Sequence, residues 1–422
     1  MSKYRIIGNM TGNSMDAIDL VLTEFNGDVM TDICTYSQAY SKDMQDKIEY
    51  LRTQTFNKTK TEIEAIPDFQ RIHDEYISQI AGSINEMCLQ YGIDKKTVDA
   101  IGFHGKTLDH NPPSKARKDG TQPYTLQIGS GQMLADLTKI PVVYDFRSDF
   151  IMKGFDGAPL VPPHNAHIAA TEGDGCYYNG GNTSNFALIS SGVAQIGADA
   201  GPFNEYIDNY IRRHTQEAYD KDGMFGKKGI LNKELLQEIF NVGRSYYETP
   251  LPKSGDPAYY HKDKIFKYTE QQRIKFEDAV HTFEYSAAYT AVQALTLVPA
   301  DVQMPERIVL FGGGWKNPVV RESFENLLRA EGFVLPEHKE QFSELRKRFA
   351  QSPVIKQSAF GDYMEARLFA DLARYKLENK AWEIPEVVQK GEHIVCGRIA
   401  EPKSDIAEYA DSVNRAAKGW KK

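Results

Sequence analysis

Three short turns rich in glycine and asparagine follow segments with strand-like patterns. Their sequences are MTGNSMD at 10–16, NGGNTSN at 179–185 and FGGGWKNP at 311–318. Glycines let backbone N–H groups approach an anion closely, and flanking threonine and serine add hydroxyl donors. The first two turns together predict a binding site for a polyphosphate. The third turn, which ends a strand and opens a helix, predicts a nucleoside pocket. Taken singly, each turn is explained more simply as a hairpin that needs a positive φ angle.

The motifs of the common nucleotide-binding loops are absent from the sequence. No GxxxxGK[ST] segment occurs, and no GxGxxG opens a βαβ unit. A nucleotide site in this chain would therefore be of another type.

The hydrophobic pattern indicates which elements carry these turns. Strands are expected at 4–9, 17–25 and 28–38, and the segment 173–202 repeats this plan as strand, Gly/Asn turn, strand, turn, strand. VDAIGFHG predicts a buried strand that ends at a histidine and a glycine, and residues 125–146 predict a βαβ unit. Helices are expected at the following positions: 60–92, a helix opened by Pro202 at about 203–214, 231–240, 277–297, the helix after the triple glycine, and 361–377. The segment 250–275, rich in Pro, Lys and Tyr, predicts loops over a cleft.

Length and composition restrict the class of protein. A chain of 422 residues exceeds the size of a single hydrophobic core, so we expect two domains. The net charge of −8 gives no electrostatic reason to expect nucleic acid or an anionic membrane as a partner, which favours a small-molecule ligand. No signal-peptide core and no run of about 18 apolar residues is present, which predicts a cytoplasmic protein. The four cysteines are too scattered for a disulfide framework or a CxxC metal site.

Eight motifs, in order along residues 4–400, resemble those of the anhydro-N-acetylmuramic acid kinase family. They are GNMTGNSMDAID, GFHGKTLDH, DFRSDF…GAPLVP, NGGNTSN, ADAGPFNEYID, YDKDG, FGGGWKNP and DYMEA. The resemblance implies an α/β chain of the two-domain sugar kinase, Hsp70 and actin type, a ribonuclease H-like fold with mixed sheets flanked by helices and an interdomain cleft. The expected domains are 1–145 with about 361–422, and 146–360.

The resemblance also implies an unusual reaction, with ATP and Mg²⁺ as cofactors and a small-molecule sugar as substrate. A carboxylate takes a proton from water as the water attacks C1 of a 1,6-anhydro sugar, and the departing O6 attacks the γ-phosphate of ATP. The product is a sugar 6-phosphate, formed during recycling of the cell wall. The family further implies a homodimer.

Carried over residue by residue, the resemblance assigns the nucleotide site. The first phosphate turn supplies Thr11, Gly12, Asn13, Ser14 and Asp16, the second supplies Gly180, Gly181 and Asn185, and the adenosine turn supplies Gly312, Gly313, Gly314 and Asn317. Asp16, Asp19 and Glu365 are the metal candidates. A satisfied core carboxylate explains Asp19 equally well, and the preference of helix N-termini for acidic residues explains Glu365.

Asp199 matches the general base of the family. It is expected at the end of a strand, just before a helix whose dipole favours the ionised carboxylate. Judged from the local sequence alone, Asp199 is equally well explained as a cap for the helix at residue 203. Glu365 is the second catalytic candidate.

The sugar is expected to contact residues at or after strand ends, where ligands gather in open α/β sheets. The candidates are His104, Gly105, Thr107, Arg147 and Asp149. The guanidinium fork of Arg147 suits a hydroxyl or carboxylate of the sugar, although a salt bridge to Asp149 is an alternative.

The sequence departs from the family pattern at several positions. Asn13 and Ala17 alter the first turn, and an extra residue precedes Asn185 in the second. Lys106, Ala200 and Phe203 replace the usual residues near the sugar, and the added charge and bulk predict a changed pocket. Two alternatives therefore stay open: a kinase of another sugar, and a nucleotide-binding member without catalysis.

Overall fold

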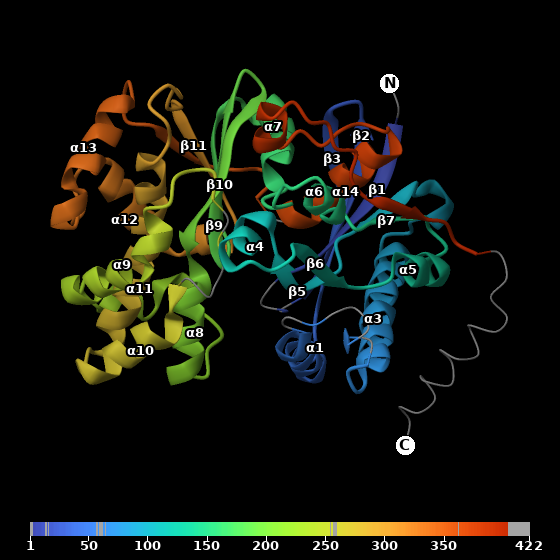
Figure 1. The fold of residues 1–422 in the computed structure, drawn as a ribbon, viewed down its shortest axis with the longest axis horizontal. Helices are drawn as coiled ribbons and strands as arrows, with labels where there is room; N and C mark the ends of the chain where they lie inside the picture. The colour runs from blue at the N-terminus through green and yellow to red at the C-terminus, as the bar shows by residue number, and fades with distance from the viewer. Residues whose placement is uncertain are drawn as a thin grey trace. The chain divides into compact units, whose positions relative to one another are not determined.

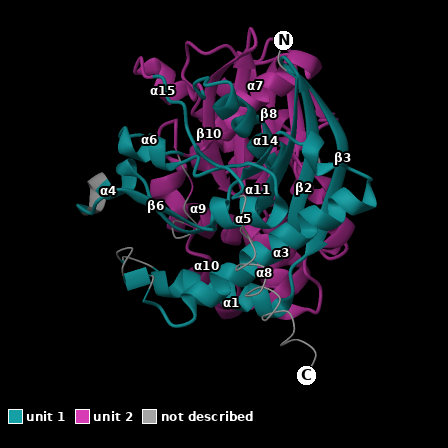
Figure 2. Ribbon diagram, turned by 90° about the vertical axis from the view of Figure 1, so that its right-hand side faces the viewer, with its two compact units in different colours: residues 1–157, 365–382, 393–422 teal, residues 158–364, 383–392 magenta. Residues whose placement is uncertain are grey.

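The chain folds into two compact units (Figures 1 and 2). The computed structural model describes residues 3–12, 15, 17–55, 58, 62–63, 65–253, 255, 260–361 and 363–403, except for the side chains of 117–119. Unit 1 comprises residues 1–157, 365–382 and 393–422, and unit 2 comprises 158–364 and 383–392. The domain limits and the cleft expected from the sequence stay predictions.

Unit 1 is built on a six-stranded mixed sheet with the order β13-β7-β4-β1-β2-β3. Strands β1, β2 and β3 form the predicted antiparallel meander, and β1, β4 and β7 run parallel. The bounds are β1 (Lys3–Thr11), β2 (Ala17–Asn26), β3 (Val29–Ala39), β4 (Ala100–Phe103), β7 (Val142–Tyr144) and β13 (Arg398–Ala400).

The helices of unit 1 differ from the expected pattern at two places. Residues 42–55 form α1, which was not predicted, and the helix expected over 60–92 begins only at residue 69. Met44, Ile48 and Leu51 of α1 are buried at helical spacing, so packing on one face stabilises it. The helices are α1 (Lys42–Thr55), α3 (Phe69–Gln90), α4 (Pro113–Asp119), α5 (Gly131–Thr138), α6 (Ser148–Met152) and α14 (Met364–Leu377), which begins one residue before unit 1 resumes.

The βαβ unit expected over 125–146 is wrong in its pairing. Strand β6 (Tyr124–Ile128) pairs antiparallel with β5 (Lys106–Asn111) in a separate two-stranded sheet, whereas β7 joins the main sheet. Local alternation of apolar residues identifies a strand but does not select its partner.

Unit 2 repeats the plan of unit 1, as the sequence predicted. Its sheet has the order β10-β9-β8-β11-β12, in which the first three strands are antiparallel and β8, β11 and β12 run parallel. This matches β3-β2-β1-β4-β7 of unit 1, strand for strand. The bounds are β8 (Gly175–Gly180), β9 (Thr183–Ser190), β10 (Val193–Pro202), β11 (Arg307–Phe311) and β12 (Val354–Gln357). The expected α/β class with mixed sheets flanked by helices is confirmed.

The segment 250–275 contains a helix, α10 (Lys262–Gln271), where loops were expected. Pro202 is the last residue of β10 and does not open a helix, because α8 begins at Asn204. The helices of unit 2 are α7 (Val161–Glu172), α8 (Asn204–His214), α9 (Lys233–Tyr247), α10, α11 (Phe276–Thr296), α12 (Pro318–Leu328), α13 (Lys339–Arg348) and α15 (Pro385–Gln389).

Two glycines allow α14 to lie directly on the sheet of unit 1. A Cβ atom at Gly8 of β1 would stand 1.9 Å from the carbonyl oxygen of Ala366, and one at Gly102 of β4 would stand 1.9 Å from that of Phe369. Only glycine permits so close an approach of helix and strand backbones. Residues from the carboxyl-terminal part of the chain therefore pack on the first strand of the fold.

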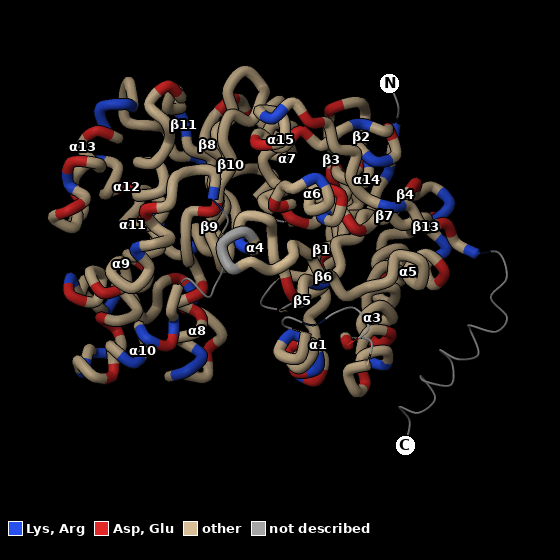
Figure 3. Tube along the Cα trace, in the orientation of Figure 1, with Lys and Arg blue, Asp and Glu red and all other residues tan. Residues whose placement is uncertain are grey.

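Each unit has its own apolar core, and charged residues of both signs are interspersed along the described chain (Figure 3). The four cysteines are free. Among the described residues, no helix is both long and apolar enough to cross a membrane.

Candidate functional site

The second turn, the third turn and Asp199 lie along one row of the sheet of unit 2. Asp199 of β10 pairs with Asn185 of β9, Asn185 pairs with Asn179 of β8, and Asn179 pairs with Phe311 of β11. Neighbouring strands are about 4.8 Å apart, so the row spans roughly 14 Å. It lies at the carboxyl ends of β8 and β11, the edge at which ligands gather in α/β sheets.

The second and third turns contact each other through Gly312. Its φ angle is +91°, and a Cβ atom there would stand 2.5 Å from Oδ1 of Asn179 and 2.9 Å from the carbonyl oxygen of Gly180. A side chain at residue 312 would therefore force the two turns apart. The structure thus brings together two segments that are more than a hundred residues apart in the sequence.

The second turn is anchored to the start of α8. The carbonyl oxygen of Asn182 accepts a hydrogen bond from the backbone N–H of Phe203 at 2.8 Å, and that of Gly181 accepts one from Asn204 at 3.1 Å. A Cβ atom at Gly180 would stand 2.7 Å from the Trp315 ring, whereas Gly181 has nothing nearer than 3.5 Å. The turn is thus held tightly at Gly180 and by the start of α8, whereas a Cβ atom at Gly181 would make only ordinary van der Waals contacts.

Phe203 belongs to the core that supports these turns. Its side chain is fully buried, and its ring centroid lies 4.6 Å from that of Trp315. The expectation that Phe203 adds bulk to the sugar pocket is therefore wrong. Ala200 is likewise fully buried.

Asp199 is held by the segment that follows α9. Its backbone N–H donates to the carbonyl oxygen of Lys253 at 2.9 Å, and its Oδ2 accepts a hydrogen bond from the N–H of Gly255 at 2.7 Å. Residue 203, the N-cap of α8, has no side-chain cap. The alternative that Asp199 caps this helix is thus wrong, and the half-buried carboxylate is held by the backbone N–H of Gly255 instead.

Lys253 is a member of the site that the sequence did not indicate. It is 6% exposed, and its Nζ donates to the carbonyl oxygens of Tyr246 at 3.1 Å and Tyr247 at 3.0 Å. Burial lowers its pKa to about 8, and the nearby negative charge of Asp199 opposes that change. A cation so placed favours the ionised form of Asp199.

Three buried tyrosines also lie near Asp199. Desolvation raises the pKa values of Tyr178, Tyr246 and Tyr260, and the carboxylate of Asp199 raises each of them further. These phenols therefore stay neutral at physiological pH.

The first turn is anchored within unit 1 by hydroxyl groups and a lysine. Thr11 is buried, with its hydroxyl 2.9 Å from that of Tyr40 and 3.2 Å from that of Tyr76. The ammonium of Lys106 donates to the carbonyl oxygen of Gly12 at 3.0 Å. Asn13, Ser14 and Asp16 lie outside the described residues, so their predicted roles stay predictions.

Lys106 lies against the first turn, although the sequence had associated it with the sugar. It is 3% exposed, and burial, followed by the charge of Arg52, lowers its pKa to about 8. Glu365 and Glu49 act in the opposite direction.

Asp19 and Glu365 influence each other electrostatically in unit 1. Oδ1 of Asp19 accepts a hydrogen bond from Ser37 at 2.8 Å, so the carboxylate has a structural partner. The pKa of Glu365, in the first turn of α14, is raised by desolvation and then by the charge of Asp19. Carboxylate oxygens are suitable ligands for Mg²⁺, and a divalent cation would relieve the repulsion.

Among the sugar candidates, the structure brings His104 and Arg147 together just after β4 and β7. Nε of Arg147 donates to Nε2 of His104 at 3.2 Å, and its Nη1 donates to the carbonyl oxygen of Gly157 at 2.6 Å. Nδ1 of His104 is 2.9 Å from the carbonyl oxygen of Gly105. Burial and the charge of Arg147 hold the pKa of His104 well below its ordinary value, so the ring is neutral.

The remaining sugar candidates have other partners. Oδ2 of Asp149 accepts a hydrogen bond from the N–H of Gly397 at 2.9 Å, and the hydroxyl of Thr107 accepts one from Gln127 at 3.3 Å. Asp149 therefore helps to tie the chain near β13 to unit 1.

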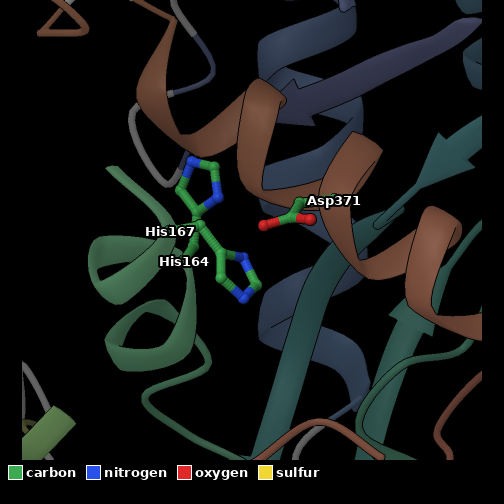
Figure 4. A group of neighbouring side chains, drawn as sticks. All are labelled: His164, His167 and Asp371. Carbon is green, nitrogen blue, oxygen red and sulfur yellow. The ribbon is translucent and has the colours of Figure 1, made fainter. Parts of the chain in front are cut away.

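Two histidines and an aspartate elsewhere in the fold are shown in Figure 4. His164 and His167 lie one turn apart on α7 of unit 2, and Asp371 lies on α14 of unit 1. Oδ1 of Asp371 accepts hydrogen bonds from Nε and Nη2 of Arg374 at 3.1 and 2.9 Å. Arg374 thus compensates the buried charge of Asp371.

The fold and these residues define a class: an α/β protein with two sheets of the same strand order, glycine-rich turns at their edges and an anchored carboxylate in unit 2. The family model for anhydro-N-acetylmuramic acid kinase matches residues 4–401. The chain belongs to the anhydro-N-acetylmuramic acid kinase family.

Curated relatives agree with this assignment over nearly their whole length. The chain is 29% identical over 401 residues to the anhydro-N-acetylmuramic acid kinase of Aliivibrio fischeri, covering 94% of this chain and 99% of that one. It is 27% identical over 387 residues to that of Nitrobacter winogradskyi, covering 90% and 94%. Among solved structures, component A of the (R)-2-hydroxyglutaryl-CoA dehydratase of Acidaminococcus fermentans is 12% identical with a TM-score of 0.43, covering 89% of this chain and 100% of that one. That likeness carries no argument about function.

Proposed function

We propose that the protein is an ATP-dependent kinase of 1,6-anhydro-N-acetylmuramic acid, which opens the anhydro ring and phosphorylates O6 in cell-wall recycling. The observation that carries this proposal is the row across the sheet of unit 2. It places Asp199, the turn at 179–185 and the turn at 311–318 at one edge. A general base and two phosphate- and nucleoside-binding turns within about 14 Å suit a phosphoryl transfer coupled to hydrolysis.

In the proposed reaction, Asp199 takes a proton from a water molecule while the oxygen of that water attacks C1 of the sugar. The bond between C1 and O6 breaks, and O6 attacks the γ-phosphorus of ATP, releasing ADP. Gly255 and Lys253 prepare this step, because one orients the carboxylate and the other favours its ionised form. The turns at 10–16 and 179–185 supply N–H and hydroxyl groups to the phosphates.

Mg²⁺ fits the carboxylate oxygens of Asp19 and Glu365, with Asp16 as a further predicted ligand. If bound there, the ion would neutralise charge on the phosphates and relieve the electrostatic repulsion between Asp19 and Glu365. We also propose, as the resemblance implies, that the protein acts in the cytoplasm as a homodimer. Light scattering of the purified protein tests its oligomeric state.

The experiment for the proposed function combines ADP release with isotope labelling. Purified protein with ATP, Mg²⁺ and 1,6-anhydro-N-acetylmuramic acid in ¹⁸O-labelled water is expected to release ADP and to place the label at C1. Asp199→Asn is expected to lower kcat by about 10²–10⁴-fold, because general-base catalysis contributes that much. Asp174→Asn is the control, since Asp174 precedes β8 at the other end of the strand and accepts hydrogen bonds from Ser191 and Gly192. Unchanged turnover in Asp199→Asn would refute the mechanism.

Lys106 motivates one second candidate, a kinase of another sugar. The charge of Lys106 replaces the usual glutamine, and its position against the first turn alters the polar surroundings in unit 1. A panel of anhydro sugars and sugars with a free hydroxyl separates the candidates, because a free hydroxyl is phosphorylated without label at C1.

A further inference from the structure

The YDKDG motif at 219–223 has no role in the mechanism above. Its Asp220 is 3% exposed and lies just before a loop that contains two short 3₁₀ turns. Oδ2 of Asp220 accepts hydrogen bonds from the backbone N–H of Phe225 at 3.2 Å and of Gly226 at 2.8 Å, and its Oδ1 accepts one from Phe225 at 2.9 Å. Both side-chain oxygens of Asp220 thus accept hydrogen bonds that close the loop.

Glu284 of α11 is a fully buried carboxyl group beside this loop. Its Oε1 accepts a hydrogen bond from Nδ2 of Asn317 at 2.6 Å. Its Oε2 lies against Gly226, where a Cβ atom would stand only 1.7 Å away and would displace this oxygen. Glu284 therefore occupies the space between the loop and the third turn.

Oε2 of Glu284 can form a hydrogen bond with Asp220 only if Oε2 carries a proton. No hydrogen-bond donor from the described residues reaches Oε2. The side chains of Asp220 and Glu284 are hydrogen-bond partners, and an oxygen of Asp220 can accept a hydrogen bond that a protonated Oε2 of Glu284 donates. Burial, and then this contact with Asp220, raises the pKa of Glu284 to about 9. Two adjacent buried carboxyl groups that share one proton are stable, whereas two that are both ionised repel.

Asn317 connects this pair to the third turn. Because its Nδ2 donates to Glu284, its Oδ1 faces the other way and accepts hydrogen bonds from the N–H groups of Val319 at 2.9 Å and Val320 at 3.4 Å. Asn317 is thus both the N-cap of α12 and the residue that ends the triple-glycine turn. Without Glu284, Nδ2 of Asn317 loses this acceptor, and only the cap of α12 still holds the amide.

We propose that Asp220, Glu284 and Asn317 form a hydrogen-bonded chain that holds the third turn in the shape needed to bind the nucleoside part of ATP. Glu284 is a positioning residue in this chain, since it acts through Asn317. The inference rests on the proposed function, and it gives the YDKDG motif a role in nucleotide affinity.

The test measures binding of ADP with Mg²⁺ by calorimetry, which needs no sugar substrate. Glu284→Ala is expected to weaken ADP binding by at least about tenfold. The loss of the hydrogen bond to Asn317 and the resulting freedom of the third turn together correspond to such a factor. Glu284→Gln is expected to bind within about threefold of the unmodified protein, because its amide donates to Asp220 and accepts from Asn317 as a protonated carboxyl does. In kinetics, KM for ATP rises in Glu284→Ala while KM for the sugar does not.

Tyr289→Phe is the matched control on the same helix. It removes the hydrogen bonds of a buried hydroxyl to His338 and to the N–H of Leu335 without touching Asn317. It is expected to lower the melting temperature and to leave ADP affinity unchanged. Should Glu284→Ala fail to fold, Asn317→Ser replaces it, because serine keeps the cap of α12 but lacks the amide donor.

Equal ADP affinity in Glu284→Ala and the unmodified protein would overturn the inference while leaving the proposed kinase intact. Equal losses in Glu284→Ala and Glu284→Gln would also overturn it, because the hydrogen-bonded chain would then not be the cause. Failure of the unmodified protein to bind ADP would instead reject the nucleotide site, and the proposed function with it.

Discussion

Replacing Lys106 with glutamine is predicted to make unit 1 more stable. Burial lowers the pKa of this lysine from 10.5 to about 8, so the folded state disfavours its charge. At about 1.4 kcal/mol for each pKa unit, this corresponds to about 3 kcal/mol at pH 7. The lost hydrogen bond to Gly12 offsets about 1–2 kcal/mol of it, which leaves a net gain of about 1–2 kcal/mol for Lys106→Gln.

The effect has a defined dependence on pH. Below about pH 8 the lysine is protonated in both the folded and the unfolded state, and the folded state bears the full cost. Between about 8 and 10.5 the folded state has lost the proton and the unfolded state still holds it, so stability rises with pH. The advantage of Lys106→Gln is therefore expected to shrink over this range.

Hydrogen exchange of the slowest amides in β1 and β4 measures the stability of unit 1 at about pH 7 and about pH 9.5. The control is Lys42→Gln. Lys42 is exposed and pairs with Asp46 one turn along α1, so its loss is expected to change stability by less than about 0.5 kcal/mol. KM for ATP is expected to rise in Lys106→Gln, since a cation beside the first turn is removed. A less stable Lys106→Gln protein at pH 7, or an advantage independent of pH, would refute the reasoning.

Two further predictions follow from the packing around β1 and Asp199. Gly8→Ala is expected to destabilise unit 1 by more than about 3 kcal/mol in denaturant unfolding, because its Cβ would stand 1.9 Å from the carbonyl oxygen of Ala366. The control is Gly82→Ala in the middle of α3, where a Cβ atom has nothing within 4 Å. This variant is expected to stabilise unit 1 by about 0.5–1 kcal/mol. Equal effects in the two variants would contradict this account of α14. Lys253→Met is expected to move the acidic limb of the pH profile of kcat/KM to higher pH, because a cation that favours ionised Asp199 is lost. If the acidic limb of this profile does not move, Lys253 has only a structural role.

The sequence predicted the parts of the fold whose information is local. The two meanders were found because alternating apolar residues are separated by Gly/Asn turns, and α14 because its apolar residues recur at helical spacing. In contrast, α10 has only a short apolar pattern, with Ile265 and Phe266 buried by packing against the rest of unit 2. The partner of β6 was also wrong, because pairing depends on contacts that a local pattern does not contain.

The candidate site was predictable only where a motif marked it. The turns and Asp199 were found from glycine content and family resemblance, but nothing near Lys253 in the sequence shows that it is buried. Gly255, two residues later, donates to a carboxylate 56 positions earlier in the chain. The capping role considered for Asp199 failed for the same reason, since β10 extends through Pro202 and places the carboxylate beside this distant segment.

The direct contact between α14 and β1 has a consequence for the order of events on the ribosome. The first strands of unit 1 are translated early, whereas the helix that covers Gly8 and Gly102 and the edge strand β13 are translated only after residue 363. Most of unit 2, an uninterrupted stretch from 158 to 364, is completed before them. Because domains fold largely as they are made, most of unit 2 is expected to be available for folding while the sheet of unit 1 still lacks the helix that packs on Gly8 and Gly102.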